Sequence, residues 1–430
     1  MTVLEDARAV LAEAPVCDAC VGRVFADRSH GLTNADRGRA LRVTVAMTDD
    51  TPFEATPPDE CWVCEGRCGD HDAWADRVVD ALETSVLETY QVGTRAPPLI
   101  EENDRLLRES AGLPPDAGES FKSAYNREVG RRVGERLGLT LDLERPDAVA
   151  LLDLDADTVE VQIHSAFVYG RYRKLSRELP QTKWPCSACD GDGEVRGDPC
   201  TVCDGSGYRY PESVEQLVAP HVCEAMGGTA ATFHGAGRED IDARMLGTGR
   251  PFVVEVESPR DRFPDVEAIQ AAINDATEKV AVKGLRLATY RSVERVKELD
   301  ADKTYRATVE FSVPVDADAL RAAADRLDGA TIEQDTPDRV DHRRATKTRT
   351  RRVHRCAVEI LDDTHAELEL DTEGGLYVKE LVNGDGDRTD PSLAGLLGVR
   401  AEVTALDVLA VEGAEDPFEV DDIFRTPPTD

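Results

Sequence analysis

The sequence predicts a mixed α/β protein with more than one domain, and three observations predict it. Stretches with apolar residues at helical spacing alternate with stretches in which every second residue is apolar, as amphipathic helices and half-buried strands require. The chain has 430 residues, 41% of them hydrophobic, which is enough for about two or three domains with cores. Pairs of cysteines interrupt the chain near its start and again near residue 190, which is typical of metal-bearing modules.

The N-terminal segment MTVLEDARAVLAEAP predicts the first helix. It is acidic and lacks the basic region of a signal peptide, so we expect a cytoplasmic protein. Residues 76–90 also have helical apolar spacing, and residues 158–170 resemble one buried strand. A later helix should open at Pro264 and Asp265 and end at Gly284.

The segment TYRATVEFSV is the clearest strand, and its alternation places Tyr305 on the apolar face. CAVEIL and AELEL can pair as a hairpin, and AEVTALDVLAVEG predicts a further strand. We place domains at residues 1–180, 181–210 and 211–430, the middle one being a short cysteine module. No stretch of about 18 apolar residues occurs, so we expect no membrane span.

The net charge of −34 is spread over the whole chain, between apolar segments. Acidic composition fits disorder, a basic partner or adaptation to salt. A disordered acidic chain would show little hydrophobic periodicity. The composition therefore favours a folded protein with a heavily hydrated surface, as in a salt-rich cytoplasm.

Eight of the 11 cysteines form four C-x-x-C pairs. Without an export signal, this pattern indicates metal sites before disulfides. Four thiolates suit a structural Zn²⁺ in a closed tetrahedron, and neither set leaves the open position of a catalytic zinc. The predicted ligands are Cys17, Cys20, Cys61 and Cys64 in the first set, and Cys186, Cys189, Cys200 and Cys203 in the second.

Cys68 is then a spare thiol or an alternative ligand. Each pair of the second set stands in a C-x-x-C-x-G-x-G repeat, whose glycines let backbone N–H groups approach the sulfurs. Four buried free thiols are the alternative, but such glycine-rich turns pack poorly as core. We assign both sets to structure or RNA docking.

Two basic segments stand out against the acidic background. Residues 339–355 contain eight Lys or Arg and one acid, so their net charge is +7 and the rest of the chain carries −41. Arginine pairs with phosphate oxygens in a fork and stacks on bases, which favours RNA contact over an internal ion-pair network. The second segment, YGRYRKLSR, interleaves cations with tyrosines and is either an RNA surface or an ordinary strand end. The predicted RNA-binding residues are Arg171, Arg173, Lys174, Arg177, Arg343, Arg344, Lys347, Arg349, Arg351 and Arg352.

The segment HGAGREDIDARMLGTGRPF places three acids between arginines in a glycine-rich bend. It can be a solvated helix start, since acids favour N-terminal turns. It can also be a nucleotide loop, although Asp240 stands where the third glycine of G-x-G-x-x-G belongs. The third interpretation makes one of its carboxylates catalytic.

That third interpretation comes from a resemblance. GREDIDARMLGTGRPFVVEV resembles the catalytic string of the archaeal and eukaryotic tRNA pseudouridine synthase family that modifies the TΨC arm. The early C-x-x-C pairs, YGRYRKLSRELPQTKWPC, KTYRATVEF, the Arg-rich segment and GGLYVKELVNGDGDRTDPSLAGLLG occur in the same order. The likeness covers nearly the whole chain. The gap between Cys189 and Cys200 is longer than the family pattern.

The resemblance implies a THUMP-containing N-terminal part and a catalytic domain built on a curved, mainly antiparallel sheet. On the family's pattern Asp240 is the catalytic carboxylate, and Lys379 is the basic residue that pairs with it. Tyr305 would stack on the flipped uracil, Tyr377 would contact the substrate, and Arg238 would support the loop or a phosphate.

The implied activity is isomerisation of uridines 54 and 55 of the TΨC loop to pseudouridine. We expect a monomer that binds tRNA, needs no small-molecule cofactor and carries structural zinc. One alternative is a THUMP-type methyltransferase, which would use FHGAG as its cofactor loop. Another is a zinc-ribbon tRNA-binding protein without catalysis, whose tRNA binding would not depend on Asp240.

Overall fold

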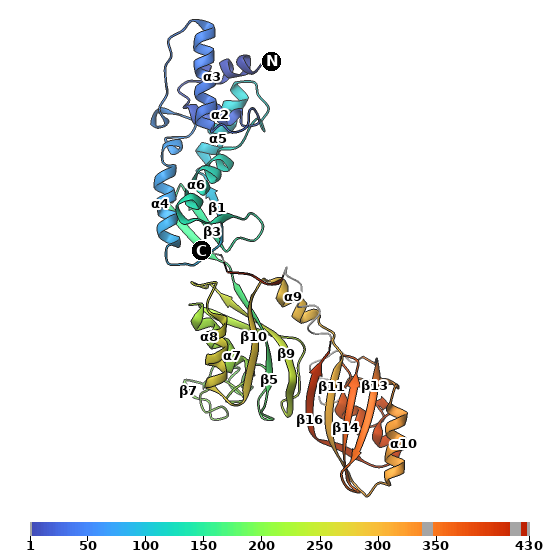
Figure 1. The fold of residues 1–430 in the computed structure, drawn as a ribbon. Helices are drawn as coiled ribbons and strands as arrows, with labels where there is room; N and C mark the ends of the chain where they lie inside the picture. Colours follow the sequence, from blue (N-terminus) through green and yellow to red (C-terminus); the bar gives the residue numbers. More distant parts are fainter. Residues whose placement is uncertain (1, 338–346, 413–422, 428–430) are drawn as a thin grey trace. The chain divides into compact units, whose positions relative to one another are not determined.

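The computed structural model describes residues 2–337, 347–412 and 423–427 (Figure 1). The chain divides into two compact units, residues 1–164 with 260–262, and residues 165–259 with 263–430. The domain boundaries that we expected at residues 180 and 210 stay a prediction about functional modules. In the described ranges, no helix has both the length and the hydropathy to span a bilayer.

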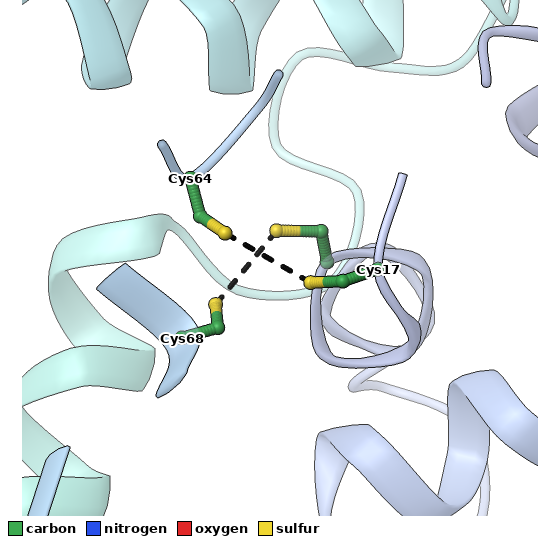
Figure 2. Close-up of side chains that lie close together, drawn as sticks. Cys17, Cys64 and Cys68 are labelled. Atoms are coloured by element: carbon green, nitrogen blue, oxygen red, sulfur yellow. Dashed lines mark hydrogen bonds between the residues drawn. The ribbon is translucent and has the colours of Figure 1, made fainter. Parts of the chain in front are cut away.

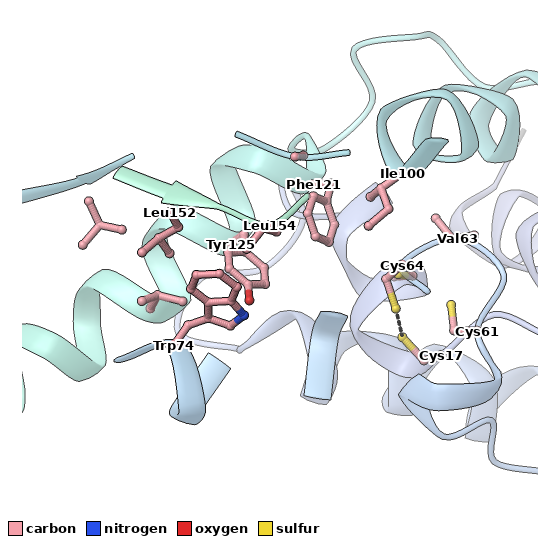
Figure 3. Packing of buried hydrophobic residues seen from close by; sticks show 14 of the residues in the cluster. Cys17, Cys61, Val63, Cys64, Trp74, Ile100, Phe121, Tyr125, Leu152 and Leu154 are labelled. Atoms are coloured by element: carbon pink, nitrogen blue, oxygen red, sulfur yellow. Dashed lines mark hydrogen bonds between the residues drawn. The ribbon is translucent and has the colours of Figure 1, made fainter. Parts of the chain in front are cut away.

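The first unit combines helices with a four-stranded sheet of order β2-β1-β3-β4. Helices α4 and α6 pack on this sheet, and β4 alone runs antiparallel to its neighbour, β3. Its core extends from Trp74 and Phe121 to the cysteines of the first metal set (Figure 3). The elements are α1 (Val3–Ala12), α2 (Asp18–Val24), α3 (Asn34–Asp49), α4 (His71–Leu82), α5 (Pro98–Ser110), α6 (Phe121–Leu137), β1 (Thr89–Arg95), β2 (Thr140–Leu141), β3 (Ala148–Asp153) and β4 (Thr158–Ile163).

The second unit is built on a ten-stranded sheet of order β10-β5-β9-β16-β11-β14-β13-β12-β15, with β8 paired to β9. Every pairing is antiparallel except β9 with β16. The strands are β5 (Ala166–Lys174), β8 (Ala230–Gly235), β9 (Ala243–Glu257), β10 (Val280–Ala288), β11 (Lys303–Phe311), β12 (Thr331–Gln334), β13 (Arg349–Ile360), β14 (His365–Thr372), β15 (Thr389–Asp390) and β16 (Ala401–Val411). The predicted mixed fold with a mainly antiparallel sheet is confirmed.

Helices cover this sheet in two groups. Helix α7 packs on β8 and β9 and α8 on β10, whereas α10 packs on β13 (Figure 1). The parallel pair β9 and β16 joins the two halves of the sheet, with Ala243 opposite Leu406. The helices are α7 (Val214–Ala225), α8 (Val266–Ala276), α9 (Arg291–Glu298), α10 (Ala317–Leu327), α11 (Val378–Asn383) and α12 (Leu393–Leu397).

Two predicted elements are corrected. The expected single strand over residues 158–170 is two strands, β4 and β5, which belong to different units and are separated by His164 and Ser165. Helix α8 ends at Ala276, and residues 280–284, which were predicted to continue it, form the start of β10 instead. Thr277 caps this helix in an extended conformation, and a short bend leads from it to the strand.

Candidate active site

A cleft of about 730 Å³ lies in the second unit, beside the parallel pair β9 and β16. Its walls come from the loop between β8 and β9, the start of β11, the start of α11 and the middle of β16. Five residues that the sequence predicted for the site line it together: Arg238, Asp240, Tyr305, Tyr377 and Lys379. The fold thus brings together residues that are far apart in the sequence.

Lys379 lies between two carboxylates in the cleft. Its Nζ atom is 3.5 Å from Oδ2 of Asp240. It is closer to Asp242, at 2.8 and 2.7 Å from the two carboxylate oxygens. The side chain of Asp240 is 33% exposed. The partly exposed carboxylate of Asp240 can therefore contact a substrate bound in the cleft while it remains paired with the ammonium of Lys379.

Glu239, the neighbour of Asp240, is buried and anchors the loop between β8 and β9 to the interior. It pairs with Nε of Arg250 at 2.9 Å, and both side chains are at most 2% exposed. The hydroxyl of Tyr172 donates to Glu239 at 2.9 Å and accepts from Nε2 of Gln181 at 2.8 Å. Gln181 also donates to the carbonyl of Gly237 at 2.9 Å. Burial, with the Glu239 carboxylate nearby, raises the pKa of Tyr172 well above its usual range, so this hydroxyl stays a donor.

A buried lysine holds the same loop from its other side. Lys174 is fully buried, and its Nζ donates to the carbonyls of Leu179, Asp240 and Ile241 at 2.9, 3.0 and 2.8 Å. Burial lowers the pKa of Lys174 to about 8. Arg177 also donates to the carbonyl of Asp242, at 3.1 Å. The loop that carries Asp240 is therefore fixed by cations from β5 and the residues that follow it.

These contacts correct part of the predicted RNA surface. Arg171 is 6% exposed and donates to the carbonyls of Thr248 and Gly249 at 2.9 Å each. Arg171 and Lys174 are internal residues, because their cationic groups already bind backbone carbonyls in the interior. Arg173 is exposed and Arg177 partly so, and RNA binding by these two stays a prediction.

The two predicted substrate tyrosines are held differently. Tyr305 is half-buried in β11, where burial raises its pKa to about 12. Tyr377 precedes α11, and the buried side-chain amide of Gln334 makes two hydrogen bonds with its backbone. The N–H of Tyr377 donates to Oε1 of Gln334 at 2.9 Å, and Nε2 of Gln334 donates to the carbonyl of Tyr377 at 3.0 Å. No sequence pattern indicated Gln334, because a lone glutamine in a short strand belongs to no motif.

The described part of the Arg-rich segment adjoins this cleft. The guanidinium carbon of Arg349 lies 5.9 Å from the ring centre of Tyr377. Nε of Arg351 donates to the carbonyl of Gly374 at 2.7 Å, next to cleft residue Gly375. Arg352 and Lys347 are exposed. The predicted residues Arg343 and Arg344 lie outside the described residues.

The lining residues that the sequence had not assigned to the cleft include Trp184, Tyr210 and Lys303. Burial lowers the pKa of Lys303 to about 8. Trp184 and Lys303 stand inside the quoted family segments PQTKWPC and KTYRATVEF. Their position in those segments was a signal that could have identified them.

Two groups of four thiols within the described residues can hold a metal ion, with ligand atoms within 4.8 Å of one another. A tetrahedral zinc with Zn–S bonds of about 2.3 Å requires sulfurs about 3.8 Å apart. Two sulfur pairs of the first group are 3.9 and 3.8 Å apart, and two of the second are 4.0 and 3.7 Å apart. The donor sets therefore fit a closed, structural site.

The first group differs from the predicted ligand set. It contains Cys17, Cys20, Cys64 and Cys68, so the thiol that the sequence left as an alternative replaces Cys61. Figure 2 shows Cys17, Cys64 and Cys68 turned toward one another. Cys61 is buried close by, near Cys17 and Cys64 (Figure 3). Arg23, 1% exposed, donates to Sγ of Cys20 at 3.4 Å and so offsets thiolate charge.

The second group has the predicted four members, Cys186, Cys189, Cys200 and Cys203. The N–H of Gly193 donates to Sγ of Cys189 at 3.3 Å, and the N–H of Gly207 does the same for Cys203. A Cβ atom at Gly193 would lie 2.4 Å from a backbone carbonyl oxygen. The predicted reason for the glycines is confirmed, because only glycine allows both knuckles to close.

Comparison with known proteins identifies the family of the chain. The family model described as "Pus10, C-terminal" matches residues 167–412, and "Pus10 THUMP domain, archaeal" matches residues 74–153. The class defined by this combination is a pseudouridine synthase with an N-terminal THUMP domain. A protein of Halorubrum lacusprofundi named "tRNA pseudouridine synthase Pus10" is 58% identical over 99% of this chain and 100% of its own.

A protein of the same name from Methanothrix thermoacetophila is 42% identical over 94% of this chain and 93% of its own. The chain therefore belongs to the Pus10 family of tRNA pseudouridine synthases, and the resemblance drawn from the sequence is confirmed. A crystal structure of a Cbf5-Nop10-Gar1 complex covers 45% of this chain and 44% of its own. With 18% identity and a TM-score of 0.30, that likeness is too weak to carry an argument.

Proposed function

We propose that this chain isomerises uridines 54 and 55 in the TΨC loop of tRNA, with Asp240 as the catalytic carboxylate. One observation carries the proposal: a partly exposed Asp240 shares a cleft with Tyr305, Tyr377 and Lys379. The family of the chain supplies the reaction class. The choice of the two TΨC uridines rests on the resemblance of the whole chain to TΨC-arm enzymes.

The chemistry needs few groups. The glycosidic bond from C1′ to N1 breaks, the uracil rotates, and C5 forms a bond to C1′. C5 then loses its proton, and N1 gains a proton. The carboxylate of Asp240 acts as a nucleophile or stabilises the charged intermediate. The ammonium of Lys379 stands 3.5 Å behind it. No electron is transferred, and the chemistry needs no small-molecule cofactor.

The tyrosines would hold the flipped base. Extruding a nucleotide costs a few kcal/mol, and stacking on an aromatic ring returns part of that cost. Tyr305 has its ring in the cleft, and its pKa of about 12 keeps the hydroxyl protonated over the working range. Tyr377 lines the same cleft, two residues before Lys379, and would make the second contact with the base.

The tRNA contacts follow from the remaining predictions. We infer that the N-terminal module, residues 1–180, binds the tRNA body through its THUMP domain. The exposed cations Lys347 and Arg352, with Arg349 beside Tyr377 and Arg351 beside Gly374, would contact the TΨC arm. Structural zinc bound by both thiol groups would stabilise the two modules, and we expect the protein to act as a monomer.

Pseudouridine mapping on an unmodified tRNA transcript tests the proposal, in high salt and with no added cofactor. Wild type should form pseudouridine at positions 54 and 55, and Asp240→Asn should bind the tRNA without forming any. Asp275→Asn, an exposed acid on α8 outside the cleft, is the matched control and should react like wild type. If wild type binds tRNA but makes no pseudouridine, the proposal falls and a zinc-bearing tRNA-binding protein takes its place.

A further inference from the structure

The second cysteine module is joined to the cleft by two aromatic residues at its base. Trp184 precedes Cys186, and Tyr210 follows Gly207. The N–H of Cys186 donates to the carbonyl of Gly207 at 2.8 Å, and the N–H of Arg209 donates to that of Trp184 at 2.9 Å. The two ends of the module are thus tied together, and both aromatic rings emerge from the same end.

These rings form a wall of the cleft that holds Asp240. The ring centres of Trp184 and Tyr210 are 5.5 Å apart, with planes at 81° to each other. The guanidinium carbon of Arg238 lies 4.9 Å from the Trp184 ring, two residues before Asp240. That of Arg209 lies 5.7 and 5.6 Å from the two rings. Both arginines are exposed, and both rings are half-buried.

We propose that Trp184, Tyr210, Arg209 and Arg238 form a subsite that stacks on an unpaired base next to the target uridine. Aromatic faces and guanidinium planes are the groups on which splayed RNA bases stack. The arginines can also pair with the flanking phosphates. The inference rests on the proposed function, because it takes the target uridine to lie at Asp240.

The metal in the second module would serve this subsite. Four thiolates would fix the knuckles, and the knuckles join the two segments that carry Trp184 and Tyr210. Without the metal, the two ends of the module remain joined by backbone hydrogen bonds and by the contact between the two rings. The module then acts in RNA binding through the rings at its base as well as in stability.

Trp184→Ala and Trp184→Phe test the subsite, because the second variant keeps a stacking face. Stacking is worth about 1–3 kcal/mol per base, so Trp184→Ala should weaken binding of the unmodified tRNA roughly tenfold, and Trp184→Phe should retain most of it. Both variants should keep two metal ions per chain. Arg321→Ala, an exposed arginine on α10 outside the cleft, is the control and should bind like wild type.

Fluorescence gives a readout that does not depend on catalysis. Trp184 is the only one of the three tryptophans in the second unit. Stacking on a base should quench its emission when tRNA is added, and Trp184→Phe should lose that part of the quenching. A module without metal, Cys186→Ser with Cys200→Ser, should bind tRNA as weakly as Trp184→Ala, and adding Trp184→Ala to it should weaken binding little further.

The outcomes separate the two proposals. If wild type makes pseudouridine and Trp184→Ala binds tRNA as tightly as wild type, the subsite is refuted and the proposed function stands. If wild type makes none, the proposed function falls, and the tRNA-dependent quenching still decides whether bases stack on Trp184. If Trp184→Ala loses metal or melts early, Arg209→Ala with Arg238→Ala replaces it, and unchanged tRNA affinity in that variant refutes the subsite.

Discussion

Replacing Glu239 by Gln removes one charge from the buried pair beneath Asp240. The pair Glu239 and Arg250 is at most 2% exposed, with 2.9 Å between Nε and Oε2. Gln has the same shape and can still accept from Tyr172, so the change leaves Arg250 as an uncompensated buried cation. Breaking such a pair costs about 3–5 kcal/mol. We expect the lower end, about 3 kcal/mol, because the remaining hydrogen bonds survive.

The expected loss is visible in a thermal melt followed by near-UV circular dichroism. About 3 kcal/mol lowers the melting temperature of a domain of this size by roughly 6–10 °C. Glu224→Gln, an exposed acid at the end of α7, is the matched control and should stay within about 1 °C of wild type. The rate of pseudouridine formation should fall in Glu239→Gln as well, because Glu239 precedes Asp240 in the same loop.

A double variant isolates the charge from the packing. Glu239→Gln with Arg250→Gln removes both charges of the pair, so its destabilisation should be smaller than the sum of the two single changes. A Glu239→Gln protein that melts with wild type would refute the account of this loop. So would strict additivity in the double variant, since it would mean that the two side chains do not act as a pair.

Two further predictions concern a pH profile and a metal count. Burial lowers the pKa of Lys174 to about 8, whereas an unfolded lysine titrates near about 10.4. Between these values the unfolded chain binds more protons, so the contribution of Lys174 to stability rises with pH, while the carbonyls of Asp240 and Ile241 lose a donor. The reaction rate should therefore fall above about pH 8 without an earlier melt, and a rate that is flat to about pH 9.5 contradicts this role. For the N-terminal metal, Cys68→Ser should reduce the metal content from two ions per chain to one in native mass spectrometry, and Cys61→Ser should not; the reverse result restores Cys61 to the ligand set.

Alternation predicted four strands of the ten-stranded sheet, β11, β13, β14 and β16, whereas the start of β10 was expected as helix. The predicted strand of residues 304–313 is β11 (Lys303–Phe311), and the hairpin of β13 and β14 follows the predicted segments. Alternation failed at residues 158–170, because apolar residues continue across the boundary between two units. A pattern of side chains cannot tell which sheet a strand joins.

The site was predictable only in part. The resemblance supplied Asp240, Tyr305, Tyr377 and Lys379, and composition supplied the thiols. Which four of five nearby thiols meet is set by backbone geometry, and spacing alone favoured Cys61. For the buried partners Glu239 and Arg250, the sequence offered no signal beyond their position within the catalytic string.

The basic segment YGRYRKLSR was predicted to face RNA, yet its alternation pointed inward. Lys174 has the same parity in β5 as Val168 and Tyr172, and all three are fully buried. An ammonium at a core position of a strand needs acceptors, and Lys174 finds them in the carbonyls of Leu179, Asp240 and Ile241. Parity alone does not decide burial in β5, because Arg171, of the opposite parity, is buried as well.

The choice of lysine at these positions follows from the geometry. The sequence has 51 Lys and Arg, of which only nine are lysine, and three of those nine, Lys174, Lys303 and Lys379, lie in or beneath the cleft. An ammonium is compact and directs three donors in a tripod, whereas guanidinium is a planar fork. Lys174 donates to three carbonyls within 3.0 Å, an arrangement that a fork cannot match. Lysine also changes its pKa readily when buried, as it does at Lys174 and Lys303. These three lysines thus stand where a small, tunable cation is required, whereas the other six lysines of the chain are exposed.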